Sequence, residues 1–174
     1  MKKTILLLLI LCFSFSGCEK DDICDGSTVT TPRLVITFYD FNNSAVEKNA
    51  TNLTIIADGM EDAVSFNGST LINGTTVSIP LKANVDTTTF RFILNFGSTN
   101  QASLPNEDVI QFNYSRENTF VSRACGFKTN YTLNAIDPFV HTDAAVPDTK
   151  WMRHVAVKNY IIANENETHL EIFY

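Results

Sequence analysis

The sequence predicts an all-β protein, a single antiparallel β-sandwich of about seven to nine strands with Ig-like or jelly-roll-like topology, preceded by a cleaved signal peptide. Three observations predict the sandwich. Apolar and polar residues alternate over several short stretches, Asn-Gly and Asp-Gly turn dipeptides recur between them, and few stretches have the helical period. A chain of 174 residues has room for one ordinary domain.

The first strands are expected in the stretches "PRLVITFYDF" (32–41) and "TNLTIIADG" (51–59), which are rich in β-branched and aromatic residues. In the first of them Leu34, Ile36 and Phe38 share one face, because side chains alternate along a strand. The second ends in an Asp-Gly turn. Shorter strands follow, separated by two Asn-Gly dipeptides, of which one is expected to close a hairpin.

The central strands are expected at "TTTFRFILNF" (87–96) and "DVIQFNYS" (108–115), which alternate most clearly. A turn is expected at residues 116–119, directly after the second strand. The aromatic side chains expected to build the core are Phe90, Phe92, Phe96, Phe112 and Tyr114.

The last third of the chain is expected to close the sandwich. Residues 120–136 form a run too long for a flat strand, so we expect a bulge or bend at Gly126. Residues 137–148 contain two prolines and are expected to be a loop. Final strands are expected within 151–163 and 168–174.

An export leader is predicted at the start of the chain. Two lysines supply its basic end, and residues 4–15 are an apolar stretch shorter than the roughly 20 residues that span a bilayer. We therefore expect residues 1–17 to be a signal peptide, 18–31 a lipidated tether and 32–174 the β-sandwich domain.

Cys18 is the expected lipidation site. The stretch "FSGC" resembles the lipoprotein signal, in which small residues precede a cysteine that becomes bonded to lipid. With two or three acyl chains the anchor would be stable, since each buried CH₂ contributes about 0.8 kcal/mol. The alternative is an ordinary signal peptide that leaves Cys18 a plain thiol.

The charged residues after Cys18 indicate the destination. They look like the signal that routes lipoproteins of the Bacteroidota to the outer cell surface, and they are Glu19, Lys20, Asp21 and Asp22. The expected location is therefore the outer membrane, lipid-anchored and on the cell surface. Two alternatives stay open: the charges form only a solvated tether, and the protein faces the periplasm.

The charge balance argues against a nucleic-acid partner. The chain has 13 basic and 19 acidic side chains, and removing Lys2 and Lys3 with the leader leaves 11 against 19, a net charge of −8. Binding to phosphate needs a concentrated basic patch, and none follows Lys3. The expected partners are the membrane, through the lipid, and an envelope protein or glycan.

Two cysteines remain once the leader and the lipid site are set aside. Cys24 and Cys125 could form one disulfide in an oxidising compartment. Alternatively, Cys125 is a nucleophile with a histidine as its base, or the two cysteines are buried thiols. The candidate bases are His141, His154 and His169.

Three stretches, "TPRLVITFYD", "FVSRACGFKTNY" and "NENETHLEIFY", resemble an uncharacterised family of flavobacterial-type (Bacteroidota) lipoproteins, classed as a domain of unknown function. The resemblance covers nearly all of the chain after the leader. It implies a lipoprotein, and it transfers no catalytic residue.

No motif predicts a cofactor, a metal site or a catalytic centre. The acidic clusters do not have calcium-loop spacing, and the histidines are scattered. Glu107 and Asp108 are adjacent, so in a strand they would point to opposite faces. Trp151, the single tryptophan, is a candidate for stacking on a ligand, although a buried anchor is the simpler role.

The function expected from the sequence is therefore a non-enzymatic envelope lipoprotein whose β-domain binds or scaffolds an unknown ligand. One alternative is an envelope enzyme that uses Cys125 or scattered carboxylates. Another is a small outer-membrane β-barrel, because the chain ends in an alternating stretch with a terminal aromatic residue.

Overall fold

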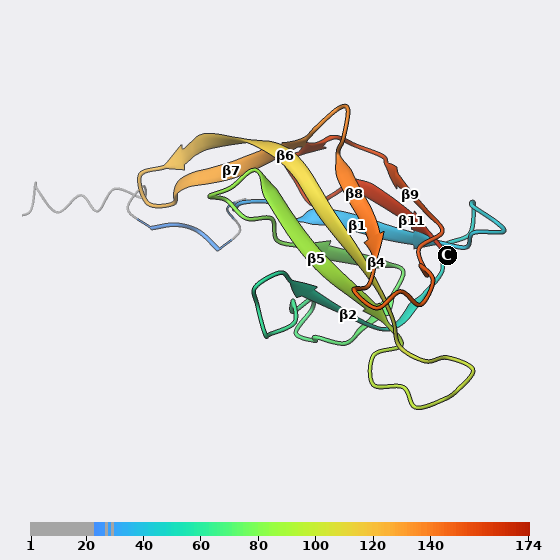
Figure 1. Cartoon of the computed structure of the whole chain (residues 1–174). Helices are drawn as coiled ribbons and strands as arrows, with labels where there is room; N and C mark the ends of the chain where they lie inside the picture. Colours follow the sequence, from blue (N-terminus) through green and yellow to red (C-terminus); the bar gives the residue numbers. More distant parts are fainter. Residues whose placement is uncertain (1–22, 27, 29) are drawn as a thin grey trace, which may run out of the picture.

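The computed structural model describes residues 23–26, 28 and 30–174, which form eleven strands arranged in two sheets (Figure 1). The predicted all-β sandwich is confirmed. Over this part of the chain, no helix has the length and apolar character needed to cross a membrane. The leader (1–17), Cys18 and the export signal lie outside the described residues.

The smaller sheet has four strands. In spatial order they are β4 (Thr76–Ile79), β1 (Leu34–Tyr39), β11 (Leu170–Phe173) and β9 (His154–Val157). β1 and β11 run parallel, with Ile36 opposite Leu170. This is the one parallel pairing among the described strands of an otherwise antiparallel sandwich, and it places the last strand beside the first.

The larger sheet has seven strands. Six of them follow the order β10 (Ile161–Ile162), β7 (Gly126–Leu133), β6 (Asn106–Ser122), β5 (Thr87–Leu94), β2 (Ala50–Ala57) and β3 (Ile72–Gly74). The seventh, β8 (Phe139–Asp143), pairs with residues 108–112 of β6, a part of β6 that also pairs with β5.

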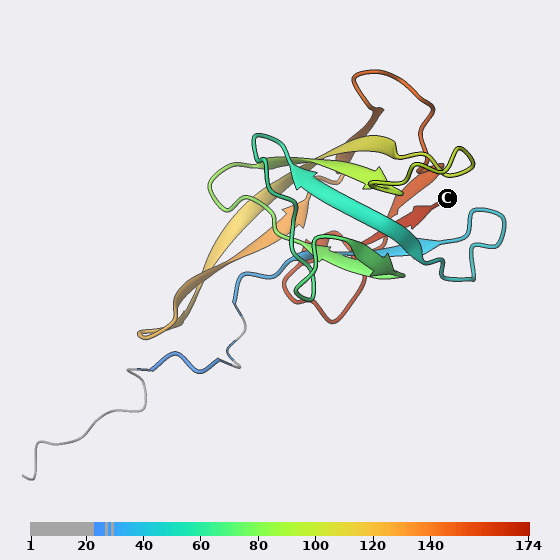
Figure 2. The ribbon, with the colours of Figure 1, turned by 90° about the horizontal axis from the view of Figure 1, so that it is seen from below.

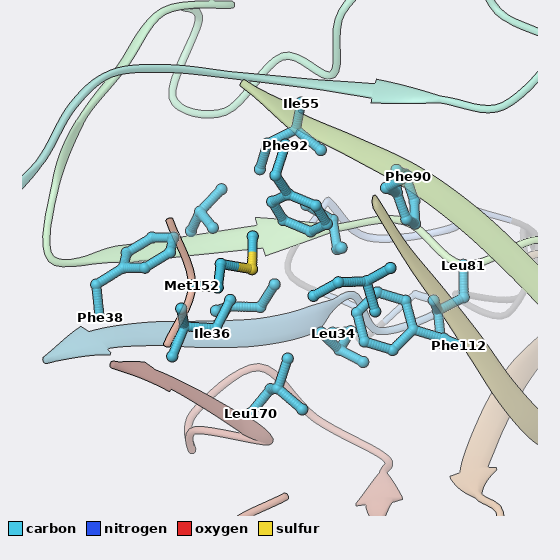
Figure 3. Close-up of a cluster of buried hydrophobic side chains, with 14 of the residues drawn as sticks. Leu34, Ile36, Phe38, Ile55, Leu81, Phe90, Phe92, Phe112, Met152 and Leu170 are labelled. Atoms are coloured by element: carbon cyan, nitrogen blue, oxygen red, sulfur yellow. The ribbon is translucent and has the colours of Figure 1, made fainter. Parts of the chain in front are cut away.

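The core lies between the two sheets and contains the side chains that the alternation placed there. Leu34, Ile36 and Phe38 of β1 are fully buried, and Figure 3 shows them across from Phe90 and Phe92 of β5. Phe112 and Tyr114 of β6 complete the predicted aromatic set. Phe96 is the exception, because β5 ends at Leu94 and leaves the Phe96 ring 46% exposed in the next loop.

Two boundaries differ from the prediction. Residues 116–119 are not a turn, because β6 continues through them to Ser122. Part of the predicted loop 137–148 is strand β8, which pairs with β6 in antiparallel orientation. The strand count exceeds nine because the described residues also include short strands such as β10, with two residues.

The extension of β6 creates a two-stranded arm. We call residues 117–130 the arm: within the described strands, this part of β6 and β7 is paired only between its own two strands. Figures 1 and 2 both show it projecting from the sandwich beside the first described residues of the chain. The run 120–136 is not one strand with a bulge or bend at Gly126: a hairpin turn at residues 123–125 divides it, and Gly126 is the first residue of β7.

Candidate functional site

A disulfide bond joins the N-terminal segment to the end of the arm. Cys24 and Cys125 are bonded, with their Cα atoms 4.9 Å apart and 101 positions between them in the sequence. Cys125 lies in the hairpin turn, where its N–H donates to Oγ of Ser122 (3.0 Å). Gly126 follows with φ of +70°, a conformation that glycine adopts without strain. The bridge therefore fixes the start of the domain to the arm's tip.

A second contact holds the segment against the arm. The backbone N–H of Thr129 in β7 donates to Oγ1 of Thr31 (3.0 Å). Between these two attachments lies a hollow of about 200 Å³, lined by the disulfide together with Thr30, Val121 and Lys128 among others. The segment thus follows the arm over several residues.

The tip of the arm carries an exposed aromatic pair. Phe120 and Phe127 are opposite each other in the register of β6 and β7. The two residues are 57% and 69% exposed, and their ring centroids lie 5.4 Å apart in an edge-to-face arrangement. Such a pair stabilises a hairpin, but it leaves most of two large apolar side chains in contact with solvent.

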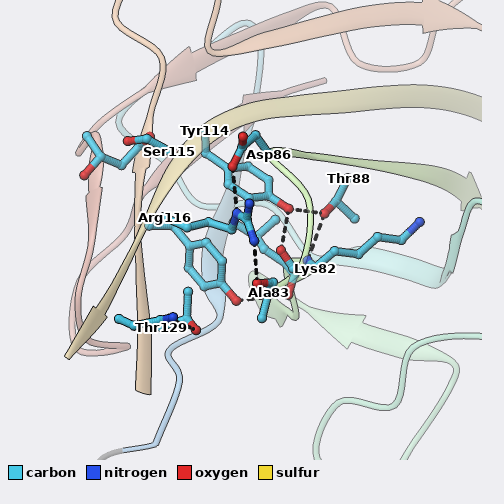
Figure 4. A network of polar contacts seen from close by, with 12 residues as sticks. Lys82, Ala83, Asp86, Thr88, Tyr114, Ser115, Arg116 and Thr129 are labelled. Atoms are coloured by element: carbon cyan, nitrogen blue, oxygen red, sulfur yellow. Dashed lines mark hydrogen bonds and ion pairs between the residues drawn. The ribbon is translucent and has the colours of Figure 1, made fainter. Parts of the chain in front are cut away.

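The base of the arm is fastened by a closed ring of hydrogen bonds (Figure 4). The N–H of Lys82 donates to Oγ1 of Thr88 (2.9 Å), which lies 2.6 Å from the Tyr114 hydroxyl, and that hydroxyl donates back to the Lys82 carbonyl (2.9 Å). Because a tyrosine hydroxyl has a single hydrogen, Thr88 must be the donor to Tyr114. Burial raises the pKa of Tyr114.

Arg116 adds a charged contact at the same place. Its Nε donates to Oδ1 of Asp86 and its Nη1 to the carbonyl of Ala83, both at 2.7 Å. The loop between β4 and β5 is therefore tied to β6 at the point where β6 leaves the sandwich.

A buried carboxylate lies toward the opposite end of β6. Asp108 is fully buried; its Oδ1 accepts the N–H of Trp151 (3.3 Å), and its Oδ2 accepts the N–H of Met152 (3.0 Å). Nε2 of His141 lies 2.8 Å from Oδ2 and carries the hydrogen, since a carboxylate accepts. Both oxygens are thus occupied by groups that position the β8–β9 loop, as expected of a structural carboxylate.

Glu107 points the other way, as the alternation of a strand requires. Its two oxygens accept from Nε and Nη2 of Arg91, at 2.8 and 2.6 Å. The two adjacent carboxylates therefore lie on opposite faces of β6, and they do not form the facing pair that glycoside hydrolysis needs.

The β8–β9 loop is held in a strained conformation next to Asp108. Thr149 has φ of 80°, which β-branched residues rarely adopt. Its N–H donates to Oδ2 of Asp143 (3.1 Å) and its carbonyl accepts from Nδ2 of Asn106 (2.8 Å). Burial and the negative charges of Asp143 and Asp108 raise the pKa of Asp148.

Trp151 does not offer a ring face for stacking on a ligand. Its side chain is buried, with Nε1 donating to the carbonyl of Phe92 (3.2 Å). The Trp151 ring contacts those of Tyr174 and Phe38, with centroid distances of 5.2 and 6.4 Å. Its candidacy as a binding residue is therefore corrected: the ring anchors the β8–β9 loop in the core.

The structure brings few of the other candidate residues together. The disulfide leaves Cys125 without the thiol that a nucleophile needs. His141 is hydrogen-bonded to Asp108. The His154 ring lies against the Phe173 ring with centroids 5.5 Å apart, and His169 is fully buried. In the described residues, no three His, Cys, Asp or Glu side chains are grouped closely enough to hold a metal ion.

A hollow of about 420 Å³ lies beside β3. Its polar lining includes Asn67, Ser69 and Asn73, its apolar lining includes Phe66 and Leu71, and none of its lining residues is charged. Such a lining could take a neutral polar group, but it contains no acid or base for catalysis.

Two features of the site were missed from the sequence. The Phe120–Phe127 pair would have followed from a hairpin turn at residues 123–125, but the Arg and Cys in that turn are not typical turn residues. The role of Asp108 had no local signal, because its partners lie more than 30 residues away in the chain.

Comparison with known proteins gives one result. Residues 52–174 match the model of a family described as "Family of unknown function (DUF6452)". No curated protein and no solved structure matches the chain.

Proposed function

Since the chain belongs to the DUF6452 family of unknown function, we propose its role from its own residues. The protein is a lipoprotein of the bacterial cell envelope, held by acyl chains on Cys18, and its β-domain binds or scaffolds a partner without catalysing a reaction. It lies on the outer membrane of a member of the Bacteroidota, facing the cell surface. Residues 1–17 are its signal peptide and 18–31 its tether.

The observation that carries the proposal is the Cys24–Cys125 bridge, six positions after Cys18. A bridge of this kind persists in the oxidising envelope and is rare in the cytosol. It supports export, and it gives the tether a firm attachment to the folded domain. A protein fixed to a surface through its first residues needs such an attachment if the domain is to keep one orientation.

The non-catalytic part of the proposal is supported by the way that the polar groups are used. The Cys125 sulfur is in the bridge, and both oxygens of Asp108 accept hydrogen bonds that hold the β8–β9 loop. Cys125 and Asp108, two groups that an enzyme hypothesis would use, are thus engaged in holding the fold.

The test is the mass of the mature protein and its location after expression in a bacterium of the Bacteroidota. The proposal expects a mature chain that begins at Cys18, carries acyl chains and fractionates with the outer membrane. Cys18→Ser should abolish acylation, and the protein should no longer fractionate with the outer membrane. The leader substitution Cys12→Ser should change neither the acylation nor the fractionation. A native chain with an unmodified Cys18 thiol would overturn the proposal.

Surface exposure has its own test. Protease added to intact cells should digest the native protein. After replacement of Lys20, Asp21 and Asp22 by alanine, the protein should remain acylated but become protected. Protection of the native protein would place it in the periplasmic leaflet instead.

A further inference from the structure

We propose that the tip of the arm, centred on Phe120 and Phe127, is a second contact with the lipid surface that holds Cys18. This contact rests on the lipid anchor proposed above and adds to it. Through this contact the arm sets the orientation of the domain relative to the membrane.

The first argument is the exposed apolar surface itself. Single exposed apolar side chains are ordinary on proteins, whereas a group of them marks a contact surface. Phe120 and Phe127 touch each other at the tip and are 57% and 69% exposed. Ile23, which is 81% exposed, precedes the cysteine that is bonded to the same hairpin turn.

The second argument is the length of the tether. The chain from Cys18 to Cys24 spans six residues and therefore at most about 20 Å. Without the bridge, the first fixed strand residue would be Leu34, 16 residues from Cys18 and up to about 55 Å away. The bridge thus keeps the arm's tip within short reach of the lipid.

The third argument is the chemistry of the tip. Aromatic side chains with cations beside them suit the boundary between acyl chains and phosphate headgroups. Arg123 lies in the hairpin turn and is exposed, whereas Lys128, the residue after Phe127 in β7, points to the opposite face of the strand. The charge of Arg123 stands out in a chain that is acidic overall. Because the acyl anchor already holds the protein at the surface, even a weak contact here would be occupied.

The opposite end of β6 provides a matched control. Asn106 and Phe120 are 14 positions apart in the strand, about 45 Å at 3.3 Å per residue. Phe96, 46% exposed, lies in the loop that precedes Asn106. Figure 1 shows this β5–β6 loop at the far side of the molecule from the arm. If the arm's tip rests on the lipid, Phe96 is held well away from it.

The experiment uses the complete acylated protein in vesicles of phosphatidylethanolamine and phosphatidylglycerol, with and without brominated acyl chains. Three variants each add one tryptophan to the buried Trp151: Phe127→Trp, Phe120→Trp and Phe96→Trp. The wild-type emission is subtracted. We expect the two arm variants to show blue-shifted emission that brominated lipid quenches several-fold more than it quenches Phe96→Trp.

Equal quenching at the arm and at Phe96 would overturn the proposal. So would a blue shift in the arm variants without quenching, because it would show that the arm packs on protein, such as a second copy of the chain. The mass of each sample separates the two proposals. Acylated protein with an unquenched arm overturns the membrane contact alone, whereas protein without acyl chains on Cys18 overturns the anchor and the contact together.

Discussion

Nε2 of His141 lies 2.8 Å from Oδ2 of Asp108, and the Asp108 side chain is fully buried. The two residues come from β8 and β6, which are neighbours in the larger sheet. The same carboxylate accepts the backbone N–H groups of Trp151 and Met152. One side chain therefore joins β6, β8 and the loop to β9.

Replacing Asp108 by asparagine should cost about 3 kcal/mol in the free energy of unfolding, since a donor amide would face donor groups in a buried place. Urea unfolding followed by circular dichroism measures this loss. Glu107→Gln is the matched control, because it removes a charge at the adjacent, partly exposed position and should cost less than about 1 kcal/mol. Equal losses in both variants would show that Asp108 is not the anchor of the loop.

The contrast between these neighbours also shows what the sequence could predict. Alternation alone put Leu34 and Phe90 in the core and separated Glu107 from Asp108, because side-chain direction in a strand is a local property. Residues 116–119 were expected to turn because they are polar. They remain extended because β7 supplies a partner strand, with Arg116 opposite Tyr131.

The candidate site likewise has one part that the sequence could predict and one part that it could not. A pairing of Cys24 with Cys125 could be inferred by elimination among four cysteines. Its position at the tip of an arm could not, since the arm exists only if the turn falls at 123–125 rather than earlier. The parallel pairing of β1 with β11 joins residues more than 130 positions apart, and no local pattern encodes it.

Breaking the disulfide should destabilise the domain by about 2–3 kcal/mol. The loss of loop-closure entropy over 101 positions would alone suggest about 4.7 kcal/mol for a loop of about 100 residues. We expect less, because the released N-terminal segment gains freedom in the folded state as well.

Urea unfolding with and without a thiol reductant measures the contribution of the bridge. The double variant Cys24→Ser/Cys125→Ser should unfold at the reduced protein's midpoint and should not respond to reductant. A native protein whose midpoint ignores the reductant would contradict this prediction.

Stability should fall as the solution is made mildly acidic, because of His169. Burial lowers its pKa below the ordinary value of 6.5, although Glu167 and Glu165 oppose the shift. Its Nδ1 accepts the N–H of Val35 (3.0 Å), and among the described residues its buried Nε2 has no partner. The folded state therefore holds a neutral imidazole.

Below pH 6.5 the unfolded chain takes up a proton at His169 that the folded chain does not. The stabilisation is complete above that pH and is lost at up to about 1.4 kcal/mol per pH unit until the lowered pKa is reached. Unfolding free energies on both sides of pH 6.5 measure the slope. His169→Asn keeps an acceptor for Val35 and should flatten it. A slope that is unchanged in this variant would assign the acid sensitivity to other groups.

Tyr114→Phe should loosen the base of the arm. Removing the hydroxyl opens the ring of hydrogen bonds and leaves the Lys82 carbonyl and the Thr88 hydroxyl each without one partner, which should cost about 2 kcal/mol. Tyr131→Phe is the matched control, since Tyr131 packs edge-to-face on Tyr114 at 5.2 Å but makes a single hydrogen bond, to the Leu81 carbonyl (3.1 Å). The control should cost about 1 kcal/mol.

The two variants should also differ in the dynamics of the arm. Tyr114 precedes the point at which β6 leaves the sandwich, so opening its ring of hydrogen bonds should speed amide hydrogen exchange in residues 117–130 more than in β1 or β5. Tyr131→Phe should leave the exchange pattern of the arm close to that of the native protein. If exchange in the arm is equally fast in both variants, the disulfide and the cross-strand pairs set the arm's rigidity, and the ring at its base does not.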